Sequence, residues 1–390
     1  MNHSWPLNIN NFTEHDRSDI ADFIKSPNNR WTQDKEVMNF EKLFADYIGS
    51  KYSVFVSSGS TANTILAQFI KDKYFKDQKI VVLPSTTWQT SCSPWIREGF
   101  IVKFIDISLS DFSFNFDKLE EFVSHNYNDI ACIFPTSLIG YSPNIEAYQK
   151  LQKKYNVKIM FDNCENSLGQ YNHKNLSSYF TSTTSTYFGH QIQSVEGGFI
   201  FTNSLEEYEY FLMLRNHGMN RGLLPYGLDN KKYKNDNVDA LFDFYCLGNN
   251  YRNTDINAFI GQKDLTRATF YKNRRQYLYN IYQSLLDRNI YYLPSLNRSK
   301  EEDVPFCLPV IPKDKSIKEK AIDICKNNNI EYRPIISGFL GYQTCYKPYF
   351  TTDKDYPNSI FLHNNGFYVG LHPGLTEDQI ITLVTMLNNI

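Results

Sequence analysis

The chain has 390 residues, of which 42% are hydrophobic, and this length can hold one large and one small domain. Its formal net charge is −2 and its lysines are scattered, so we expect neither nucleic acid nor a membrane surface as a partner. The seven cysteines are widely spaced without a C-x-x-C motif, which argues against a disulfide framework and a structural metal site. The first residues lack the basic and apolar parts of a signal peptide, and no apolar run could span a bilayer, so we expect a cytoplasmic protein.

Three units are predicted along the chain. Residues 1–35 are interrupted by prolines and are predicted to form an N-terminal arm, with a short helix at Asp19–Ile24. Residues 36–260 are predicted to form the large domain, and residues 261–390 a bridging helix followed by a small C-terminal domain.

Short, mostly apolar runs alternate with helical patterns in the large domain. Continuous apolar runs are typical of strands buried on both faces, and their alternation with helices predicts an α/β sheet with mainly parallel strands. The last two runs are joined too tightly for a helical crossover, so this pair is predicted to be antiparallel. The predicted strands are Ser53–Ser58, Ile80–Pro84, Ile101–Ile107, Ile130–Pro135, Lys158–Phe161, Thr184–Phe188 and Phe199–Thr202. The helices predicted between them are Thr61–Phe75, Phe116–Ser124 and Asn144–Tyr155.

The last part of the chain is predicted from weaker patterns. Residues 219–240 are polar and rich in Gly, Asn and Lys, and are expected to form a loop. One long helix is predicted at Gln262–Leu286. The small α+β domain is expected to contain strands Phe306–Ile311 and Tyr368–Gly370 and a final helix at Glu377–Leu387.

Three strand ends carry side chains suited to a ligand. After the first strand, Gly59 permits a tight turn, and the free N–H groups of the next helix, with Ser60 and Thr61, suit an anion. Asp162 ends another strand, at the edge where open α/β sheets bind ligands. Trp88 follows a third and could stack on a flat ring. Taken alone, the Ser/Thr-rich turn is more often only a helix cap, Asp162 is about as often a cap as a ligand contact, and Trp88 is typical of an ordinary core aromatic residue.

A fourth stretch gives these signals a common meaning. Ser185, a His five residues later and then Val195-Glu196-Gly197-Gly198 resemble the cofactor stretch of the DegT/StrS sugar aminotransferase family. In that family a Lys stands where this chain has His190, and residues 175–230 contain no lysine. The resemblance implies the fold of type I pyridoxal 5′-phosphate (PLP) enzymes: a large domain with a seven-stranded, mostly parallel sheet and a small C-terminal α+β domain.

Carried over by position, the resemblance implies roles for individual residues. Glu165 stands near the cofactor ring, where the family usually has Gln. The stretch from Gly248 to Asp255 resembles the family's Gly-Tyr-Asn-Tyr-Arg-x-x-Asp, so Asn250 would reach the cofactor of the other subunit in a homodimer. The other implied cofactor contacts are Gly59, Ser60, Thr61 and Ser185 at the phosphate, Asp162 at the pyridine nitrogen and Trp88 on the ring face. Candidate substrate contacts are His217, Arg221 and Arg333.

His190 is the departure that decides the predicted reaction. An imidazole forms no Schiff base with PLP, but it is a general base near neutral pH. The same replacement, with Asp162-Asn-Cys-Glu165, is typical of the family's lysine-lacking branch, the GDP-4-keto-6-deoxymannose 3-dehydratases. This implies a lyase of deoxysugar and lipopolysaccharide O-antigen biosynthesis that uses PLP as pyridoxamine 5′-phosphate (PMP). It would dehydrate a nucleotide-linked 4-keto-6-deoxyhexose at C3 to a 4-keto-3,6-dideoxyhexose. His190 would be the base and a candidate proton donor, and glutamate would regenerate PMP.

Two other functions remain open on the sequence: a nucleotide-sugar 4-aminotransferase, and a catalytically silent PLP-fold binding or regulatory protein. A second His-bearing branch uses an iron–sulfur cluster and a reductase partner. Its cluster needs closely spaced cysteines, whereas Cys246, Cys307, Cys325 and Cys345 are isolated, so neither cluster nor reductase is expected. The nucleotide, whether GDP, CDP or dTDP, is not determined.

Overall fold

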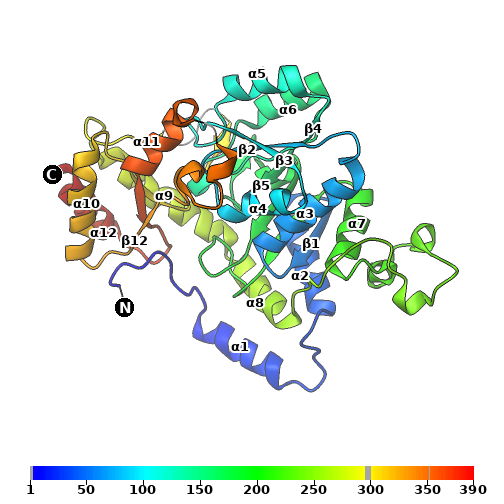
Figure 1. The fold of residues 1–390 in the computed structure, drawn as a ribbon. Helices are drawn as coiled ribbons and strands as arrows, with labels where there is room; N and C mark the ends of the chain where they lie inside the picture. The colour runs from blue at the N-terminus through cyan, green and yellow to red at the C-terminus, as the bar shows by residue number, and fades with distance from the viewer. Residues whose placement is uncertain (1–2, 295–299, 351) are drawn as a thin grey trace.

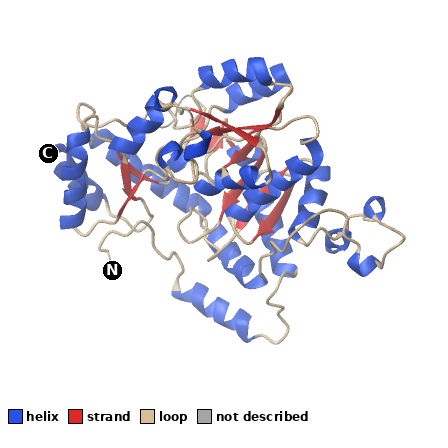
Figure 2. Cartoon of the chain, in the orientation of Figure 1, coloured by secondary structure: helices blue, strands red, loops and turns tan. Residues whose placement is uncertain are grey.

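The computed structural model describes residues 3–294, 300–350 and 352–390 (Figures 1 and 2). Outside this range lie residues 1–2 of the expected arm, and residues 295–299 and 351 of the expected C-terminal unit. The arm contains helix α1 (Glu14–Lys25), which is longer than the predicted Asp19–Ile24. It begins earlier because Thr13 and Asp16 form a capping box that satisfies the first backbone N–H groups.

The large sheet has the predicted strands. Four are hydrogen-bonded in the order β1 (Tyr52–Val56), β9 (Gly198–Thr202), β8 (Thr181–Ser185) and β5 (Met160–Asp162). Three more follow in the order β3 (Ile101–Ile105), β2 (Ile80–Pro84) and β4 (Ile130–Ile133). Parallel bridges from Ile133 to Ile159 and from Thr136 to Asp162 join β4 to β5, so all seven form one layer.

Within this layer β9 runs antiparallel to β1 and β8, while the other neighbouring strands are parallel. The predicted antiparallel pair is therefore confirmed. The predicted range of β8, Thr184–Phe188, is wrong by three residues, because Thr181–Ser185 is the part buried between β5 and β9. The chain after Ser185 leaves the sheet and forms the turn that carries His190.

Helices cover both faces of the sheet (Figure 2). One face packs against α3 (Gly59–Tyr74), α4 (Ser93–Arg97) and α7 (Leu205–Arg215) through residues such as Val54 and Val81. The other face packs against α2 (Lys35–Ile48), α5 (Phe116–Asn126) and α6 (Ile145–Tyr155) through the alternate residues Phe55 and Val82. This alternation places successive strand residues on opposite faces, as the strand period requires.

A second sheet lies at the left of Figure 1, near the C-terminus. It is antiparallel, in the order β11 (Cys307–Val310), β13 (Phe367–Gly370) and β12 (Tyr332–Pro334). The strands predicted near Phe306 and Tyr368 are confirmed, whereas β12 was not expected. Helices α10 (Lys315–Asn327), α11 (Pro357–Asn365) and α12 (Glu377–Asn388) flank it. A small sheet of β10 (Glu301–Glu302), β6 (Gln170–Tyr171) and β7 (Lys174–Asn175) completes the strands of the described residues.

The single helix predicted at Gln262–Leu286 is wrong. The structure has α8 (Asp255–Leu265) and α9 (Ala268–Leu285), separated at Thr266 and Arg267. The break is stabilised because Arg267 reaches both Asp16 of the arm and Asp264 of α8.

Residues 219–240 form the predicted excursion, which projects from the body at the right of Figure 1. It contains the short 3₁₀ turns Asn220–Tyr226 and Lys231–Tyr233, and a third follows at Ala240–Phe242. Its base is anchored because the Tyr226 hydroxyl donates to the buried carboxylate of Glu41 at 2.7 Å. None of the helices in the described ranges combines the length and apolar character needed to cross a bilayer.

Candidate functional site

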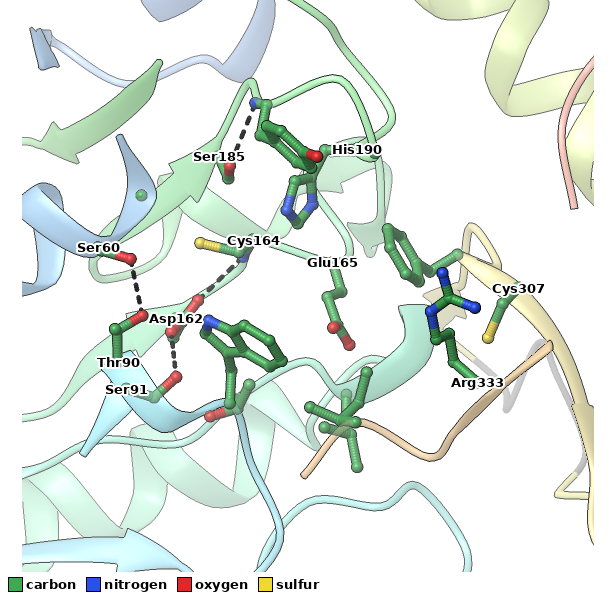
Figure 3. A pocket seen from close by; sticks show the side chains of 18 of the residues that line it. Ser60, Thr90, Ser91, Asp162, Cys164, Glu165, Ser185, His190, Cys307 and Arg333 are labelled. Atoms are coloured by element: carbon green, nitrogen blue, oxygen red, sulfur yellow. Dashed lines mark hydrogen bonds between the residues drawn. The ribbon is translucent and has the colours of Figure 1, made fainter. Parts of the chain in front are cut away.

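A cavity of about 440 Å³ opens where the large sheet meets the second sheet (Figure 3). Its walls come from the ends of β5 and β8, the first turn of α3, the start of β11, and β12 and β13. The N-terminal arm also contributes, through Leu7 and Asn8. Parallel strands thus present their carboxyl ends to this space, as in other open α/β sheets.

Asp162, the last residue of β5, is held by three hydrogen-bond donors. Its Oδ2 accepts from Ser91 Oγ at 2.6 Å and from Asn63 Nδ2 at 2.9 Å. Its Oδ1 accepts from the backbone N–H of Cys164 at 3.1 Å. Asn63 is itself fixed because its carbonyl oxygen accepts from Thr183 Oγ1 at 2.6 Å. These three donors fix the orientation of the Asp162 carboxylate at the cavity wall.

The first turn of α3 lies against the end of β8. A Cβ on Gly59 would come within 2.9 Å of Ser185 Cβ, and one on Gly198 within 2.3 Å of the Ser58 carbonyl carbon, so both positions require glycine. Ser60 lines the cavity and its Oγ lies 2.8 Å from Thr90 Oγ1. Three polar features therefore converge here: free helix N–H groups, the Ser60 hydroxyl and the Ser185 hydroxyl.

His190 lies on the turn between β8 and β9, with its backbone N–H donating to the Tyr187 carbonyl at 2.9 Å. Its Nδ1 has no hydrogen-bond partner among the described residues. Burial lowers the pKa of this imidazole to about 4, and Arg275 lowers it further, although the Cys164 carbonyl and Asp162 oppose the shift. At neutral pH the side chain is therefore an uncharged base. No lysine is among the described residues that line the cavity.

Glu165 is a second titratable group on the cavity wall. Its Oε2 accepts a hydrogen bond from the backbone N–H of Ile139 at 2.6 Å. Burial raises the pKa of this carboxyl to about 8, and the nearby charge of Asp162 acts in the same direction. The side chain is therefore mainly a neutral acid near pH 7.

Trp88 and Arg333 line the same cavity but are more exposed. Trp88 is 54% exposed and lines the cavity, so its side chain is accessible to a ligand. The guanidinium of Arg333 is oriented by Glu331, whose Oε1 accepts from Nη2 at 2.6 Å. The other oxygen of Glu331 accepts from the backbone N–H of Leu7 at 3.0 Å, so the arm and Arg333 share one carboxylate.

Four predicted residues lie outside this cavity. The Thr61 hydroxyl is used in the helix cap, where it donates to the Ser58 carbonyl at 2.8 Å. Asn250 is exposed and bridges to Asn216, away from the cavity of its own chain. His217 and Arg221 belong to the same outlying segment, and the Arg221 guanidinium lies over the Phe242 ring at 5.3 Å.

The structure adds residues that the sequence did not single out: Asn63, Ser91, Leu7 and Asn8. Asn63 lies one turn after Ser60 in the same helix, and that spacing was an available signal. The other three reach the site through tertiary contacts alone. The described cysteines are free, and the described residues contain no cluster that could hold a metal ion.

A model of the DegT/DnrJ/EryC1/StrS aminotransferase family matches residues 13–388. The chain belongs to this family. A curated relative, the GDP-4-keto-6-deoxy-D-mannose 3-dehydratase of Yersinia pseudotuberculosis, is 29% identical over 98% of each chain. The solved Escherichia coli GDP-4-keto-6-deoxy-D-mannose-3-dehydratase with bound hydrated PLP has a TM-score of 0.89 and is 27% identical, covering 99% of this chain and all of its own.

The DegT/DnrJ/EryC1/StrS membership predicted from Ser185, His190 and Gly197-Gly198 is confirmed, and so is the predicted fold class. An aminotransferase of pseudoaminic acid biosynthesis from Helicobacter pylori has a TM-score of 0.84 at 18% identity, over 100% of this chain and 99% of its own. At that identity the likeness shows that the fold is shared. The same family fold thus occurs in a dehydratase and in an aminotransferase.

Proposed function

We propose that this chain is a PLP/PMP-dependent 3-dehydratase. It removes the C3 hydroxyl of a nucleotide-linked 4-keto-6-deoxyhexose and yields a 4-keto-3,6-dideoxyhexose. The observation that carries the proposal is His190: a neutral imidazole lies in a cavity in which the described residues offer no lysine. The names of the relatives from Yersinia pseudotuberculosis and Escherichia coli support the same reaction class.

The residues present fit a PLP-type cofactor. The first turn of α3 and the hydroxyls of Ser60 and Ser185 suit its phosphate, because helix N–H groups and hydroxyls bind anions. Asp162, held by three donors, would keep the pyridine nitrogen protonated. The exposed indole of Trp88 would cover the ring. When bound, the cofactor supplies an amine for the C4 ketone and an electron sink for breaking the C3–O bond.

The side chains of this protein accept and release the protons of the reaction. His190 accepts one, since its Nδ1 is without a partner among the described residues and its low pKa keeps it uncharged. The same low pKa makes the imidazolium a strong acid that gives the proton up readily. A lysine amine at this position would instead capture the aldehyde form of the cofactor and favour amino transfer.

The proposed substrates are a nucleotide sugar and L-glutamate as amino donor. A solved relative carries GDP-perosamine and another a PLP–glutamate geminal diamine, and both share the fold at 26–27% identity. Arg333, at the cavity and with more N–H groups than its two described hydrogen bonds use, would bind an anionic part of either substrate.

The enzyme is proposed to act as a homodimer. Residues 238–247 expose a run of large apolar side chains, among them Phe242, Phe244 and Leu247, the last of which is 91% exposed. Such a run is typical of an interface, and a second copy is the proposed partner. Asn250 follows it directly and would reach the partner's cavity, with His217 and Arg221 of the same segment near the substrate.

The test begins with absorbance spectra of the purified protein with PLP, before and after L-glutamate, and with borohydride treatment of a parallel sample. We expect conversion from aldehyde to amine form and no borohydride-fixed lysine adduct. GDP-, CDP- and dTDP-linked 4-keto-6-deoxyhexoses are then supplied with glutamate. Ammonia release marks dehydration, and a stable 4-amino sugar would show an aminotransferase instead. Failure to bind PLP would favour a silent binding protein.

A further inference from the structure

Glu165 shares the cavity with His190, and its carboxyl group is held by an unusual turn. Its side chain is 8% exposed. The residue that binds it, Ile139, has φ of 48°, a left-handed conformation that is rare and strained for a β-branched residue. Strain of this kind clusters at functional sites, where the surrounding structure maintains it.

The turn is fixed on both sides of Ile139. Its N–H donates to Glu165 Oε2 at 2.6 Å, and its carbonyl accepts from the N–H of Phe306 at 3.1 Å. The next residue, Gly140, leaves no room for a side chain, since a Cβ there would lie 2.4 Å from the Phe306 nitrogen. The strained peptide therefore positions one carboxyl oxygen of Glu165 against the start of β11.

The other oxygen, Oε1, has no hydrogen bond with any described residue, and Glu165 lines the cavity. An amide N–H needs an acceptor, so in the neutral acid Oε2 is the carbonyl oxygen and the proton is on Oε1. Burial and Asp162 favour this neutral form by raising the pKa. Among the described residues, the titratable groups that act on Glu165, or on which it acts, are Asp162, Cys164, Cys307 and Tyr368, none of them a cation. His190 and Arg333 line the same cavity.

We propose that Glu165 is the proton donor to the hydroxyl group that leaves C3 of the sugar. This role rests on the proposed function. The C3–O bond breaks with its electron pair on oxygen, Oε1 gives its proton to that oxygen, and water departs. The compensating electron pair comes from the C–H bond that His190 deprotonates. Glu165 is left as a carboxylate and His190 as an imidazolium, so one proton passed back through the site or through solvent restores both.

This division assigns different protons to two residues. At the start of the reaction His190 is uncharged and is the proton acceptor, whereas Glu165 is protonated and is the proton donor. Glutamate-dependent regeneration of the amine form involves no departing hydroxyl. It therefore requires His190 but not the acidity of Glu165.

The test compares the wild type with Glu165→Gln, which keeps the size and an acceptor for the Ile139 N–H but has no transferable acid proton. Glu121→Gln, on the exposed surface of α5, is the control for loss of a carboxyl group. Three quantities are measured: the carboxylic acid band in infrared spectra of the cofactor-free protein near neutral pH, the rate of the glutamate reaction, and single-turnover ammonia release from the nucleotide sugar.

In the wild type we expect a neutral carboxylic acid band near pH 7 that Glu165→Gln loses and Glu121→Gln retains. Glu165→Gln should lower the sugar reaction by about 10²-fold or more, the usual contribution of general acid catalysis, and leave the glutamate reaction within a few-fold. The wild-type sugar rate should fall as pH rises past about 8, and the variant should lose that dependence.

Two results would overturn the role while leaving the proposed function intact: an unchanged sugar rate in Glu165→Gln, or equal losses in both reactions, which would make Glu165 a cofactor contact only. A wild type that regenerates the amine form but eliminates no nucleotide sugar would overturn the proposed function, and this role with it.

Discussion

The side-chain amide of Asn8 donates a hydrogen bond to the backbone carbonyl of Phe188 at 2.7 Å, two residues before His190. On the other side of His190, Gln193 Nε2 donates to the carbonyl of Ile9 at 3.1 Å. The N-terminal arm therefore holds the turn that carries His190 from both ends. Since Asn8 also lines the cavity, the arm is part of the site wall.

The first prediction concerns this connection. Asn8→Asp keeps the size but replaces the N–H donor with an oxygen facing the Phe188 carbonyl. Loss of one buried hydrogen bond costs about 1 kcal/mol and leaving its partner unsatisfied costs more, so we expect both half-reactions to slow about tenfold. Stopped-flow spectra of the glutamate reaction measure this. Asn10→Ala, two residues away and exposed, should change neither rate, and an unchanged Asn8→Asp would show that the arm does not position the turn.

The second prediction is the acid limit of the glutamate reaction. The pKa of His190 is lowered to about 4, so the base form exists at all higher pH values. The rate should stay level as pH falls through 6.5, the ordinary value, and drop only near 4. His190→Asn should lower the rate by about 10²–10⁴-fold at every pH. A wild-type decline centred near 6.5 would mean that the imidazole is not desolvated.

The third prediction is a pH-dependent stability that His372 produces. It is 4% exposed, and neither ring nitrogen has a hydrogen-bond partner within the described ranges. Burial lowers its pKa from 6.5 to about 4. Above 6.5 both folded and unfolded chains are neutral there. Between pH 6.5 and pH 4 this side chain is protonated in the unfolded chain but stays neutral in the folded chain. The free energy of unfolding therefore decreases as the pH falls through this range.

His372→Phe removes both the unsatisfied nitrogens and the titration. We expect the free energy of unfolding to rise by about 1–3 kcal/mol near neutral pH. Urea unfolding at neutral pH and near pH 5 should show a larger gain at the lower pH. Substituting the exposed His125 with Gln should have little effect at either pH. A loss of stability in His372→Phe would indicate that the ring nitrogens of His372 are hydrogen-bonded in solution.

A fourth prediction concerns the buried ion pair beneath the excursion. Arg215 Nη1 donates to Glu41 at 2.5 Å, and Tyr226 connects to both side chains. Arg215→Met leaves Glu41 buried without its counter-charge and should lower the free energy of unfolding by about 3–5 kcal/mol. Tyr226→Phe removes only a hydroxyl and should cost about 1 kcal/mol. Equal effects in urea titrations would argue against charge compensation as the cause.

The fifth prediction tests the proposed homodimer. Leu247→Asp should give a monomer in light scattering, because it puts a charge on an exposed apolar run. If Asn250 acts across the interface, Asn250→Ala and His190→Asn should each be inactive alone. Refolding them together should restore about a quarter of the activity, since half of randomly paired dimers are mixed and each has one intact site. No recovery would place Asn250 outside the partner's site.

Much of the large sheet could be predicted because its strands are buried on both faces and are read as apolar runs. The antiparallel β9 followed from the short connection to β8. Two features could not be predicted from local sequence patterns. Strand β12 has three residues and is too short to show a period, and the break at Thr266 depends on the contact between Arg267 and the distant arm.

At the site, the family resemblance predicted that residues at several strand ends contact one cofactor. Five of these residues do line one cavity: Gly59, Ser60, Asp162, Ser185 and His190. The contributions of the arm and of the Ile139 turn could not be predicted in this way. They depend on contacts between segments far apart in the chain, and no periodicity records such contacts. Asn250 and its neighbours stay apart from the cavity of a single chain, so their role remains a prediction about an assembly.

The turn that carries His190 is outside the ladder that builds the sheet. Register between β8 and β9 is set by pairs ending at Ser185 and Gly198, and His190 itself contributes its backbone N–H to the turn, which any residue but proline could supply. The pairing of these two strands therefore does not depend on which side chain occupies this position. A lineage could exchange amino transfer for elimination, or return, through replacements at one turn without first rebuilding its core.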